Sequence, residues 1–226
     1  MPIPLRGPLS VPFRAFGIRP SRMNPNLCTI CELGFSKVMR VRNVTIDATV
    51  MFADLRNYTG LSQSLPPDAM SRLLDAFYDT CASAIWEQDG LLNKTIGDAV
   101  MAVFNFPISH ADHAARAVRA ARELQRRCHE ARAALELGTA EFGVGIGIST
   151  GALSFGEFGR SHRDLTAIGT VVNTAARAQS AAAPGQILVT RAVVDSVDIG
   201  LVASAAHEYH LKGFAEAIEL FEAQGG

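Results

Sequence analysis

The sequence predicts an α+β domain in which a mostly antiparallel sheet is covered by helices. Three observations favour this class: strand-like apolar runs alternate with two long stretches of helical period, hairpin signals separate several strands, and 48% of the 226 residues are hydrophobic while 19% are charged. Strands and helices that interleave in this way form layers around one core. The chain is therefore expected to hold one good-sized domain with additional segments.

Residues 1–43 are interpreted as a leader and a short appendage. Residues 1–24 contain five prolines among scattered arginines and phenylalanines, so no helix or strand is expected there and the leader is predicted to be flexible. Residues 25–42 have loosely helical spacing and carry Cys28 and Cys31 as a CxxC motif. The motif is open to three interpretations: a metal site with further ligands, a redox role, or two incidental cysteines. This segment is also where an unknown regulator is expected to act.

The main domain is predicted over residues 44–226, and its first half places two acidic residues at strand ends. The run VTIDATVMFADL alternates and then becomes wholly apolar, as in a central strand, and Asp54 stands at its end. A turn at RNYTG leads to a helix that begins at the PPD sequence and buries Cys81. LLNKTIGDAVMAVFNF is two apolar runs broken at GD, which predicts a hairpin with Asp98 at its tip.

The second half is predicted to add a long helix and the remaining strands. The helix, over about residues 112–137, buries Cys128, and glutamates among its arginines indicate a solvated face. EFGVGIGIST alternates valine and isoleucine with glycine, so one face of this strand is bare and lets a backbone, a ligand or a partner chain come close. GALSFGEFG is expected as the returning strand, and LTAIG leads to a helix at TVVNTAARAQSAA. QILVT and residues 207–211 and 217–221 are predicted as short strands.

Charge and hydropathy exclude several classes of protein. The net charge of −1, from 21 basic and 22 acidic residues, leaves no overall positive field to hold nucleic acid or an anionic membrane. No apolar run approaches the ~20 residues that span a bilayer, and the N-terminus lacks the apolar stretch of a signal peptide. Four cysteines in a chain of this length suit a reducing compartment. A cytoplasmic protein is expected.

Asp54 and Asp98 are predicted to converge at one edge of the sheet, because their strands are expected to be neighbours. Two carboxylates at close range repel each other unless they share a proton or bind a divalent cation, and hard oxygen ligands favour Mg²⁺ or Mn²⁺. The turn at residues 55–60 offers backbone N–H groups for phosphates beside the metal. The alternative interpretation is a pair of solvated turn acids.

Five strings carry a resemblance to a known family. FADLRNYT, KTIGDAVMAVF, VGIGISTG, LTAIGTVVNTAAR and LKGF follow one another in the order of the class III nucleotidyl cyclase catalytic domain. Together they resemble it from about Val44 to Phe221, roughly four-fifths of the chain. The resemblance implies a ferredoxin-like βαββαβ core with extra C-terminal strands, and adenylate cyclase activity of the bacterial type.

The resemblance also implies a role for individual residues. Asp54, Asp98 and the backbone of Leu55 would hold two Mg²⁺ or Mn²⁺ ions per site. Asn173 and Arg177 would orient the ribose and stabilise the transition state, and their i, i+4 spacing on a predicted helix independently places both on one face. Lys212 would bind the distal phosphates of the nucleotide. Further substrate contacts are expected from Leu55, Arg56, Asn57, Tyr58 and Thr59.

Base choice is predicted from two positions. Lys94 and Thr166 match places where adenine-selective members carry Lys with Asp or Thr, and adenine N1 is an acceptor that suits a lysine donor. The expected reaction converts ATP to 3′,5′-cyclic AMP and pyrophosphate. In the family one chain supplies the metal aspartates and the other the base, ribose and transition-state residues, so a homodimer with shared sites is expected. The alternatives are a guanylate cyclase and a catalytically silent, nucleotide-binding regulatory dimer.

Overall fold

The computed structural model describes residues 10–21, 23–39, 43–134, 143–159, 164–197 and 205–223. Several sequence predictions fall partly outside these ranges. They are the leader at residues 1–9 and 22, the appendage at residues 40–42, the end of the long helix expected near residue 137, and the first two residues of the predicted strand EFGVGIGIST.

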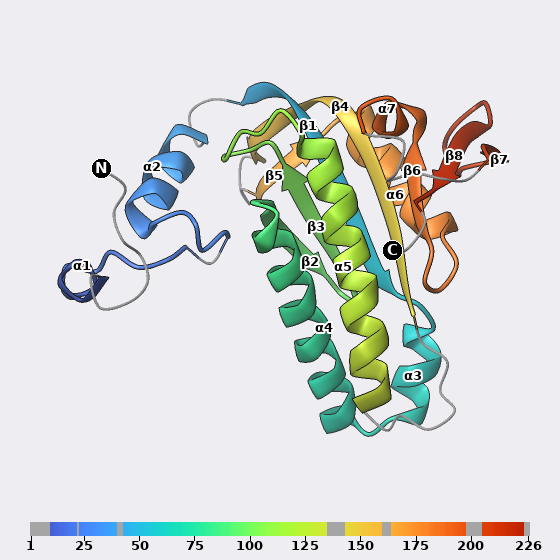
Figure 1. The fold of residues 1–226 in the computed structure, drawn as a ribbon, viewed down its shortest axis with the longest axis horizontal. Coiled ribbons are helices and arrows are strands. Elements are labelled where there is room, and N and C mark those ends of the chain that lie inside the picture. Colours follow the sequence, from blue (N-terminus) through green and yellow to red (C-terminus); the bar gives the residue numbers. More distant parts are fainter. Residues whose placement is uncertain are drawn as a thin grey trace.

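Within the described residues, a sheet of eight strands forms the centre of the molecule (Figure 1). The strands are β1 (Val44–Leu55), β2 (Leu91–Ile96), β3 (Ala99–Phe104), β4 (Val144–Phe158), β5 (Asp164–Ile168), β6 (Ile187–Thr190), β7 (His207–Tyr209) and β8 (Ile218–Glu222). Their order is β2-β3-β1-β4-β6-β8-β7, and β5 pairs with β4 outside this path. All pairings are antiparallel except that of β4 with β6. The predicted α+β class and mostly antiparallel sheet are confirmed.

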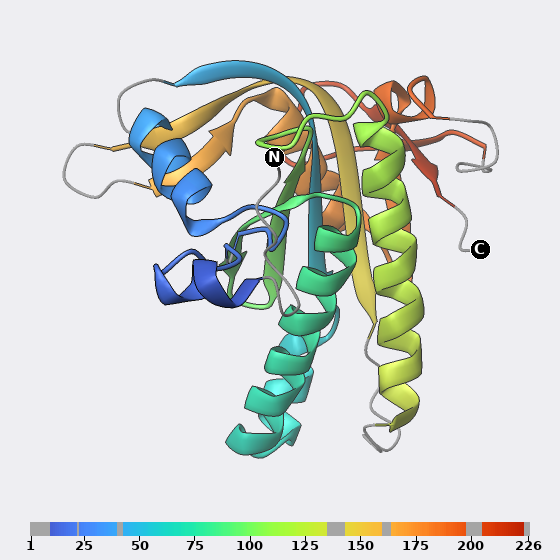
Figure 2. The same cartoon turned by 60° about the vertical axis from the view of Figure 1, so that its left-hand side comes forward.

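Helices cover both faces of the sheet (Figure 2). The helices of the described residues are α1 (Val11–Ala15), α2 (Thr29–Met39), α3 (Tyr58–Ser64), α4 (Pro67–Glu87), α5 (His113–Ala134), α6 (Thr170–Ala181) and α7 (Arg191–Val194). Successive side chains of a strand point to opposite faces. Met51 and Leu55 of β1 therefore join the core under α4 and α5, whereas Val50 and Phe52 join the core that contains residues of α2 and α6.

The glycine-rich strand and the predicted returning strand are one continuous strand, β4, so the prediction of a turn between them is wrong. β1 pairs with β4 along its whole length, from Val44 opposite Phe155 to Leu55 opposite Val144. This long ladder keeps β4 continuous past the residues that looked like a turn. Gly151, at φ +143°, lies between the part of β4 that pairs with β6 and the part that pairs with the actual returning strand, β5.

The bare glycine face of β4 is covered by the chain's own helix α6. A Cβ atom on Gly147 would lie closer than 3.0 Å to the backbone of Ala175 and Gln179. A Cβ atom on Gly145 would meet the Arg56 guanidinium at a similarly short distance. The prediction that a backbone comes close is confirmed, but that backbone belongs to the same chain, so the stripe gives no support to a partner chain at this face.

The N-terminal segment, residues 10–39, packs against the main domain. Its helix α1, with Pro12 in the first turn, contradicts the prediction of no helix in the leader. The Met23 carbonyl accepts hydrogen bonds from Trp86 Nε1 at 2.8 Å and from the backbone N–H of Leu92 at 3.2 Å. Phe35 of α2 packs on Phe106, with ring centroids 5.2 Å apart. The segment thus reaches the edge strand β2 through its backbone and Phe106 through the side chain of Phe35.

Cys28 and Cys31 lie at the start of α2 with their Sγ atoms 3.2 Å apart. Cys28 is buried, whereas Cys31 is exposed. Within the described ranges no group of three or more His, Cys, Asp or Glu side chains is arranged to hold a metal ion. The three interpretations of the motif therefore stay predictions.

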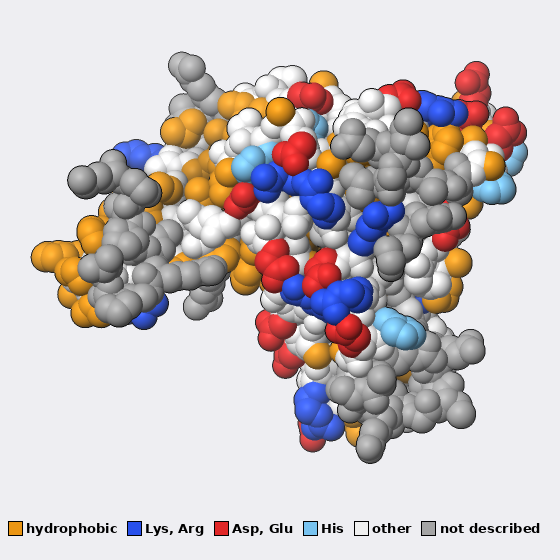
Figure 3. Space-filling view, viewed as in Figure 1, with side chains coloured by type: hydrophobic (Ala, Val, Ile, Leu, Met, Phe, Trp, Pro, Cys, Tyr) orange, Lys and Arg blue, Asp and Glu red, His pale blue; other side chains and the backbone are white. Residues whose placement is uncertain are grey.

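The arginine-rich helix α5 carries a mixed-charge surface (Figure 3). Glu123 forms ion pairs with Arg126 and Arg127, each at 2.6 Å, and Arg127 forms a second ion pair with Glu87 of α4 at 2.7 Å. Paired charges of both signs are typical of a solvated helix face. No helix in the described part of the chain is long and apolar enough to cross a membrane.

Candidate active site

Asp54 and Asp98 are brought together at one edge of the sheet. Asp54 pairs with Ala99 of β3 in the antiparallel register, and Asp98 lies in the turn that precedes Ala99. The backbone N–H of Leu55 donates a hydrogen bond to the Asp98 carbonyl at 3.2 Å. The main chain alone therefore places the two carboxylates side by side, as the sequence predicted.

The electrostatic environment of Asp54 disfavours its charge. Its side chain is 23% exposed. Burial, and secondly the charge of Asp98, raise its pKa to about 6, while Arg56, whose Nη1 lies 3.7 Å from Asp54 Oδ1, acts in the opposite direction. A single nearby guanidinium thus offsets only part of the cost of holding this carboxylate ionised.

Arg56 is engaged with its own chain. Its Nη2 donates to the Gln179 carbonyl near the C-terminal end of α6, and its backbone N–H donates to the Gly143 carbonyl at 2.7 Å. The guanidinium lies across Gly145, where any side chain would displace it. Predicted as a substrate contact, Arg56 here links the end of β1 to the end of α6.

The donor set fits divalent Mg²⁺ or Mn²⁺. Two carboxylates and the carbonyl of Leu55 are hard oxygen donors, and burial, followed by the charge of Asp98, raises the pKa of Asp54, so a cation beside it would favour its ionised form. Mg²⁺ usually takes one or two protein carboxylates and fills its remaining positions with water and substrate phosphates. No third carboxylate is required, in keeping with the absence of a larger ligand cluster among the described residues.

The turn after β1 is shorter than predicted. Only Arg56 and Asn57 form it, because α3 begins at Tyr58, with Asn57 in the left-handed conformation at φ 62°. The first N–H groups of any helix have no acceptor within that helix, so the backbone at residues 58–60 keeps donors for a ligand. Thr59 is exposed, whereas Tyr58 is half-buried and packs against the core.

The two predicted base-selecting residues lie near each other on β2 and β5. Lys94 forms an ion pair with Asp164, and Thr166 Oγ1 lies 3.4 Å from Asn93 Oδ1. Asn93 Nδ2 also donates to the Leu165 carbonyl at 3.0 Å. The structure therefore joins the segments that carry Lys94 and Thr166, although the two residues are 72 positions apart in the sequence.

The remaining predicted residues are exposed. Asn173 and Arg177 lie on the outer face of α6, and Lys212 follows Leu211 in the connection between β7 and β8. In the described structure no side-chain hydrogen bond or ion pair joins any of these three to Asp54 or Asp98. One chain thus brings the two carboxylates together and joins the segments of the predicted base-selecting residues, but leaves the α6 pair, Asn173 and Arg177, facing solvent.

Two residues at this site were missed by the sequence interpretation. Asp164 forms an ion pair with Lys94, and Asn93 lies within hydrogen-bond distance of Thr166. Neither Asp164 nor Asn93 was given a role by the sequence interpretation. The one available signal was position, because Asp164 precedes Thr166 by two residues and Asn93 adjoins Lys94. Their contacts with Lys94 and Thr166 depend on the approach of β2 and β5, which are not paired strands.

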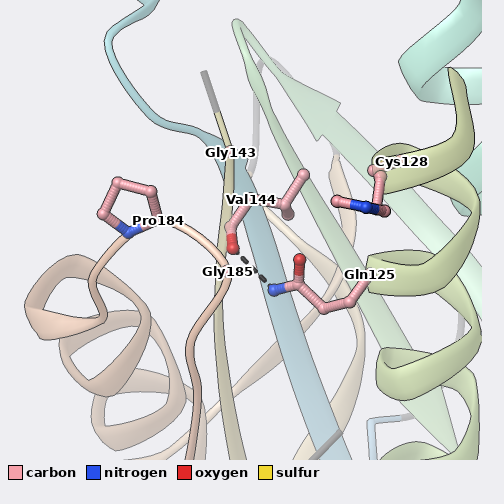
Figure 4. Close-up of a pocket in the computed structure, with 7 residues that line it drawn as sticks. Gln125, Cys128, Gly143, Val144, Pro184 and Gly185 are labelled. Atoms are coloured by element: carbon pink, nitrogen blue, oxygen red, sulfur yellow. Dashed lines mark hydrogen bonds between the residues drawn. The ribbon is translucent and has the colours of Figure 1, made fainter. Parts of the chain in front are cut away.

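A separate cavity lies between α5 and the start of β4 (Figure 4). It has a volume of about 240 Å³ and is lined by Gln125, Cys128, His129, Gly143, Val144, Pro184 and Gly185. Gln125 Nε2 donates to the Val144 carbonyl at 2.6 Å across its wall. Burial raises the pKa of the Cys128 thiol to about 12, which keeps it protonated and unreactive. No predicted site residue lines this cavity.

Comparison with known proteins identifies the family. A family model described as adenylate and guanylate cyclase catalytic domain matches residues 41–222. An adenylate cyclase of Anabaena cylindrica is 31% identical over 185 residues, which are 77% of this chain and 36% of that protein. Adenylate cyclase 1 of Rhizobium meliloti is 32% identical over 135 residues, 58% of this chain and 20% of that protein. The chain thus spans a minor part of these curated relatives.

Solved structures of both nucleotide specificities share the fold. The adenylyl cyclase CyaB from P. aeruginosa superposes with a TM-score of 0.76 at 25% identity, covering 82% of this chain and 97% of that one. The guanylyl cyclase Cya2 gives 0.75 at 25% identity, covering 81% and 94%. With the family model matching most of the sequence, the chain belongs to the adenylate and guanylate cyclase catalytic domain family.

Proposed function

We propose that this chain converts ATP to 3′,5′-cyclic AMP and pyrophosphate as a dimer of two copies. The observation that carries the proposal is the position of Asp54 and Asp98, which the β1–β3 register and the hydrogen bond from the Leu55 N–H to the backbone carbonyl of Asp98 bring together at the end of β1. Family membership supports a nucleotidyl cyclase, and curated adenylate cyclases are among its relatives.

Asp54, Asp98 and the Leu55 carbonyl would hold two divalent cations. When bound, such ions lower the pKa of the ribose 3′-hydroxyl and neutralise the leaving pyrophosphate. The chain's part is to bring two carboxylates to one place at the edge of the sheet. The β1–β3 register and the Leu55 hydrogen bond do this without help from side-chain packing.

The reaction is an in-line displacement at the α-phosphorus. The 3′-hydroxyl gives its proton to water, its oxygen forms a bond to the α-phosphorus, the bond from that phosphorus to the bridging oxygen breaks, and pyrophosphate leaves with the electron pair. Arg177, with a planar fork of donors, would bind the equatorial oxygens, where negative charge grows in the transition state. Asn173 would orient the ribose, and Lys212 would bind the distal phosphates together with donors at residues 56–59.

A second copy is proposed to complete each site. Asn173 and Arg177 lie on an exposed helix face and contact neither carboxylate in the described chain. An arginine aimed at solvent can act on the α-phosphate only if another surface brings a nucleotide to it. Two copies related by a twofold axis would each offer carboxylates to the other's α6 pair.

Lys94 favours ATP over GTP. Its ammonium donates to adenine N1, an acceptor, whereas guanine presents an N1–H donor at that position. Guanylate cyclase activity is the second candidate, because the solved structures that share the fold include a guanylyl cyclase. Lys94→Glu separates the two, since a carboxylate should lower the ATP to GTP ratio of kcat/KM by about 100-fold.

The test is cyclic nucleotide formation from ATP and from GTP, each with Mn²⁺ and with Mg²⁺. Cyclic AMP from the wild type, lost on Arg177→Ala in a folded protein, is the expected result. Formation of cyclic GMP in excess of cyclic AMP would establish the second candidate instead. Folded, dimeric protein that yields neither product would contradict the proposed activity.

A further inference from the structure

Side chains join β2 to β5 across a gap that no backbone pairing closes. In the sheet order β3, β1 and β4 separate the two strands. Yet Asn93 Nδ2 donates a hydrogen bond to the Leu165 carbonyl at 3.0 Å, and Thr166 Oγ1 lies 3.4 Å from Asn93 Oδ1. In addition, Lys94 forms an ion pair with Asp164. Four of these five residues offer polar side chains, so this contact is specific.

Lys94 is held by one partner. Its side chain is 23% exposed, and Asp164 is its acceptor within the described chain. A lysine has a flexible four-carbon stem and three N–H donors, so one charge-assisted bond fixes the ammonium and leaves two donors for a ligand. Fixing the side chain beforehand removes part of the entropy that binding would otherwise cost.

We propose that Asp164 is a positioning residue for base selection, which holds the Lys94 ammonium beside Thr166 so that it meets an acceptor on the purine ring. Asn93 keeps β5 against β2 while it does so. Adenine offers such an acceptor at N1 and guanine does not, so the device favours adenine nucleotides. This inference rests on the proposed function, because it assumes that Lys94 and Thr166 face the base.

The simpler explanation is an ordinary surface ion pair. Exposed ion pairs contribute little to stability, and Asp164 is 55% exposed. Such a pair predicts no effect of Asp164 on the choice between bases. Glu219, 51% exposed and 3.1 Å from Arg191, is a comparable pair on β8 and serves as the matched control.

The experiment measures direct binding of 3′-deoxy-ATP and 3′-deoxy-GTP with Mn²⁺, because these nucleotides lack the attacking hydroxyl and cannot be cyclised. Asp164→Ala should weaken 3′-deoxy-ATP about 10-fold, the size of one charge-assisted hydrogen bond, and leave 3′-deoxy-GTP within about 2-fold. Asp164→Asn keeps an acceptor oxygen and should recover part of the loss. Glu219→Ala should match the wild type for both nucleotides.

Kinetics and folding complete the test. With ATP, Asp164→Ala should raise KM more than it lowers kcat, and its melting temperature should stay within about 2 °C of the wild type. An unchanged preference between the two deoxynucleotides overturns the inference. Binding without turnover would contradict the cyclase proposal while the preference still decides the role of Asp164. Wild type that binds neither nucleotide overturns both.

Discussion

The two halves of the proposed site differ in how complete they are within one chain. The aspartate end, Asp54 and Asp98, is assembled by the register of β1 with β3 and by one backbone hydrogen bond of 3.2 Å. The α6 pair, Asn173 and Arg177, is exposed and contacts neither carboxylate in the part of the chain that the structure describes. Backbone pairing is enough to assemble the aspartate end. The α6 pair is fixed on a helix that packs on β4, but among the described residues no part of the aspartate end in its own chain lies in contact with it.

The largest effect should come from breaking the aspartate end. Asp54→Ala is expected to lower cyclic AMP formation at least about 1000-fold, because it removes a ligand shared by the catalytic metals. The measurement is the initial rate at saturating Mn²⁺, with Asp75→Ala, an exposed acid of α4, as control. If Asp54→Ala kept more than about a tenth of the activity, the aspartate end would not be the metal site.

The comparison between the halves becomes sharper when two inactive variants are mixed. Asp54→Ala and Arg177→Ala should each be inactive alone, yet regain about a quarter of the wild-type rate together. Random pairing makes half of the dimers mixed, and each mixed dimer has one site with both halves intact. Mixing is measured after subunit exchange, with either variant plus itself as control. No recovery in a preparation shown to contain mixed dimers would mean that each site is built within one chain.

A smaller effect is expected from loosening the platform of the α6 pair. Gly147→Ala should destabilise the protein by about 2 kcal/mol, because its Cβ would collide with the backbone of α6. The measurement is urea unfolding. Gly34→Ala in α2 has open space around the added Cβ and should be neutral or stabilising by about 0.5 kcal/mol. Equal effects of the two substitutions would show that α6 does not need the bare strand.

The smallest effect concerns the charge of Asp54 in metal-free protein. Its pKa is raised from 3.8 to about 6 in the folded state, so folding favours the protonated form and ionisation weakens the fold. Asp54→Asn should therefore stabilise the metal-free protein above about pH 6, by about 1 kcal/mol because the group is partly solvated, and by nothing below about pH 4.

The measurement for Asp54→Asn is denaturant unfolding with a chelator present, at several values of pH. Asp75→Asn, in an exposed position on α4, controls for the chemical change from carboxylate to amide. A gain in stability that does not vary with pH would mean that the charge of Asp54 does not lower the free energy of unfolding.

Sequence patterns predicted the aspartate end well because it depends on local features. Asp54 ends an apolar run and Asp98 tips a hairpin, and neighbouring strands bring such positions together. The error at β4 had the opposite cause. Gly151 looked like a turn signal, but pairing with every residue of β1 overrode it. Local preference is weak where a long ladder of hydrogen bonds competes with it.

The main strands, the two long helices and the shared face of Asn173 and Arg177 follow from periodicity and spacing, which act between near neighbours in sequence. The covering of the glycine stripe by α6, the position of Arg56 across Gly145, and the hold of Asp164 on Lys94 were decided only by the tertiary structure. Each of these joins segments far apart in sequence. Their contact depends on how the whole sheet curves and packs, which no local pattern encodes.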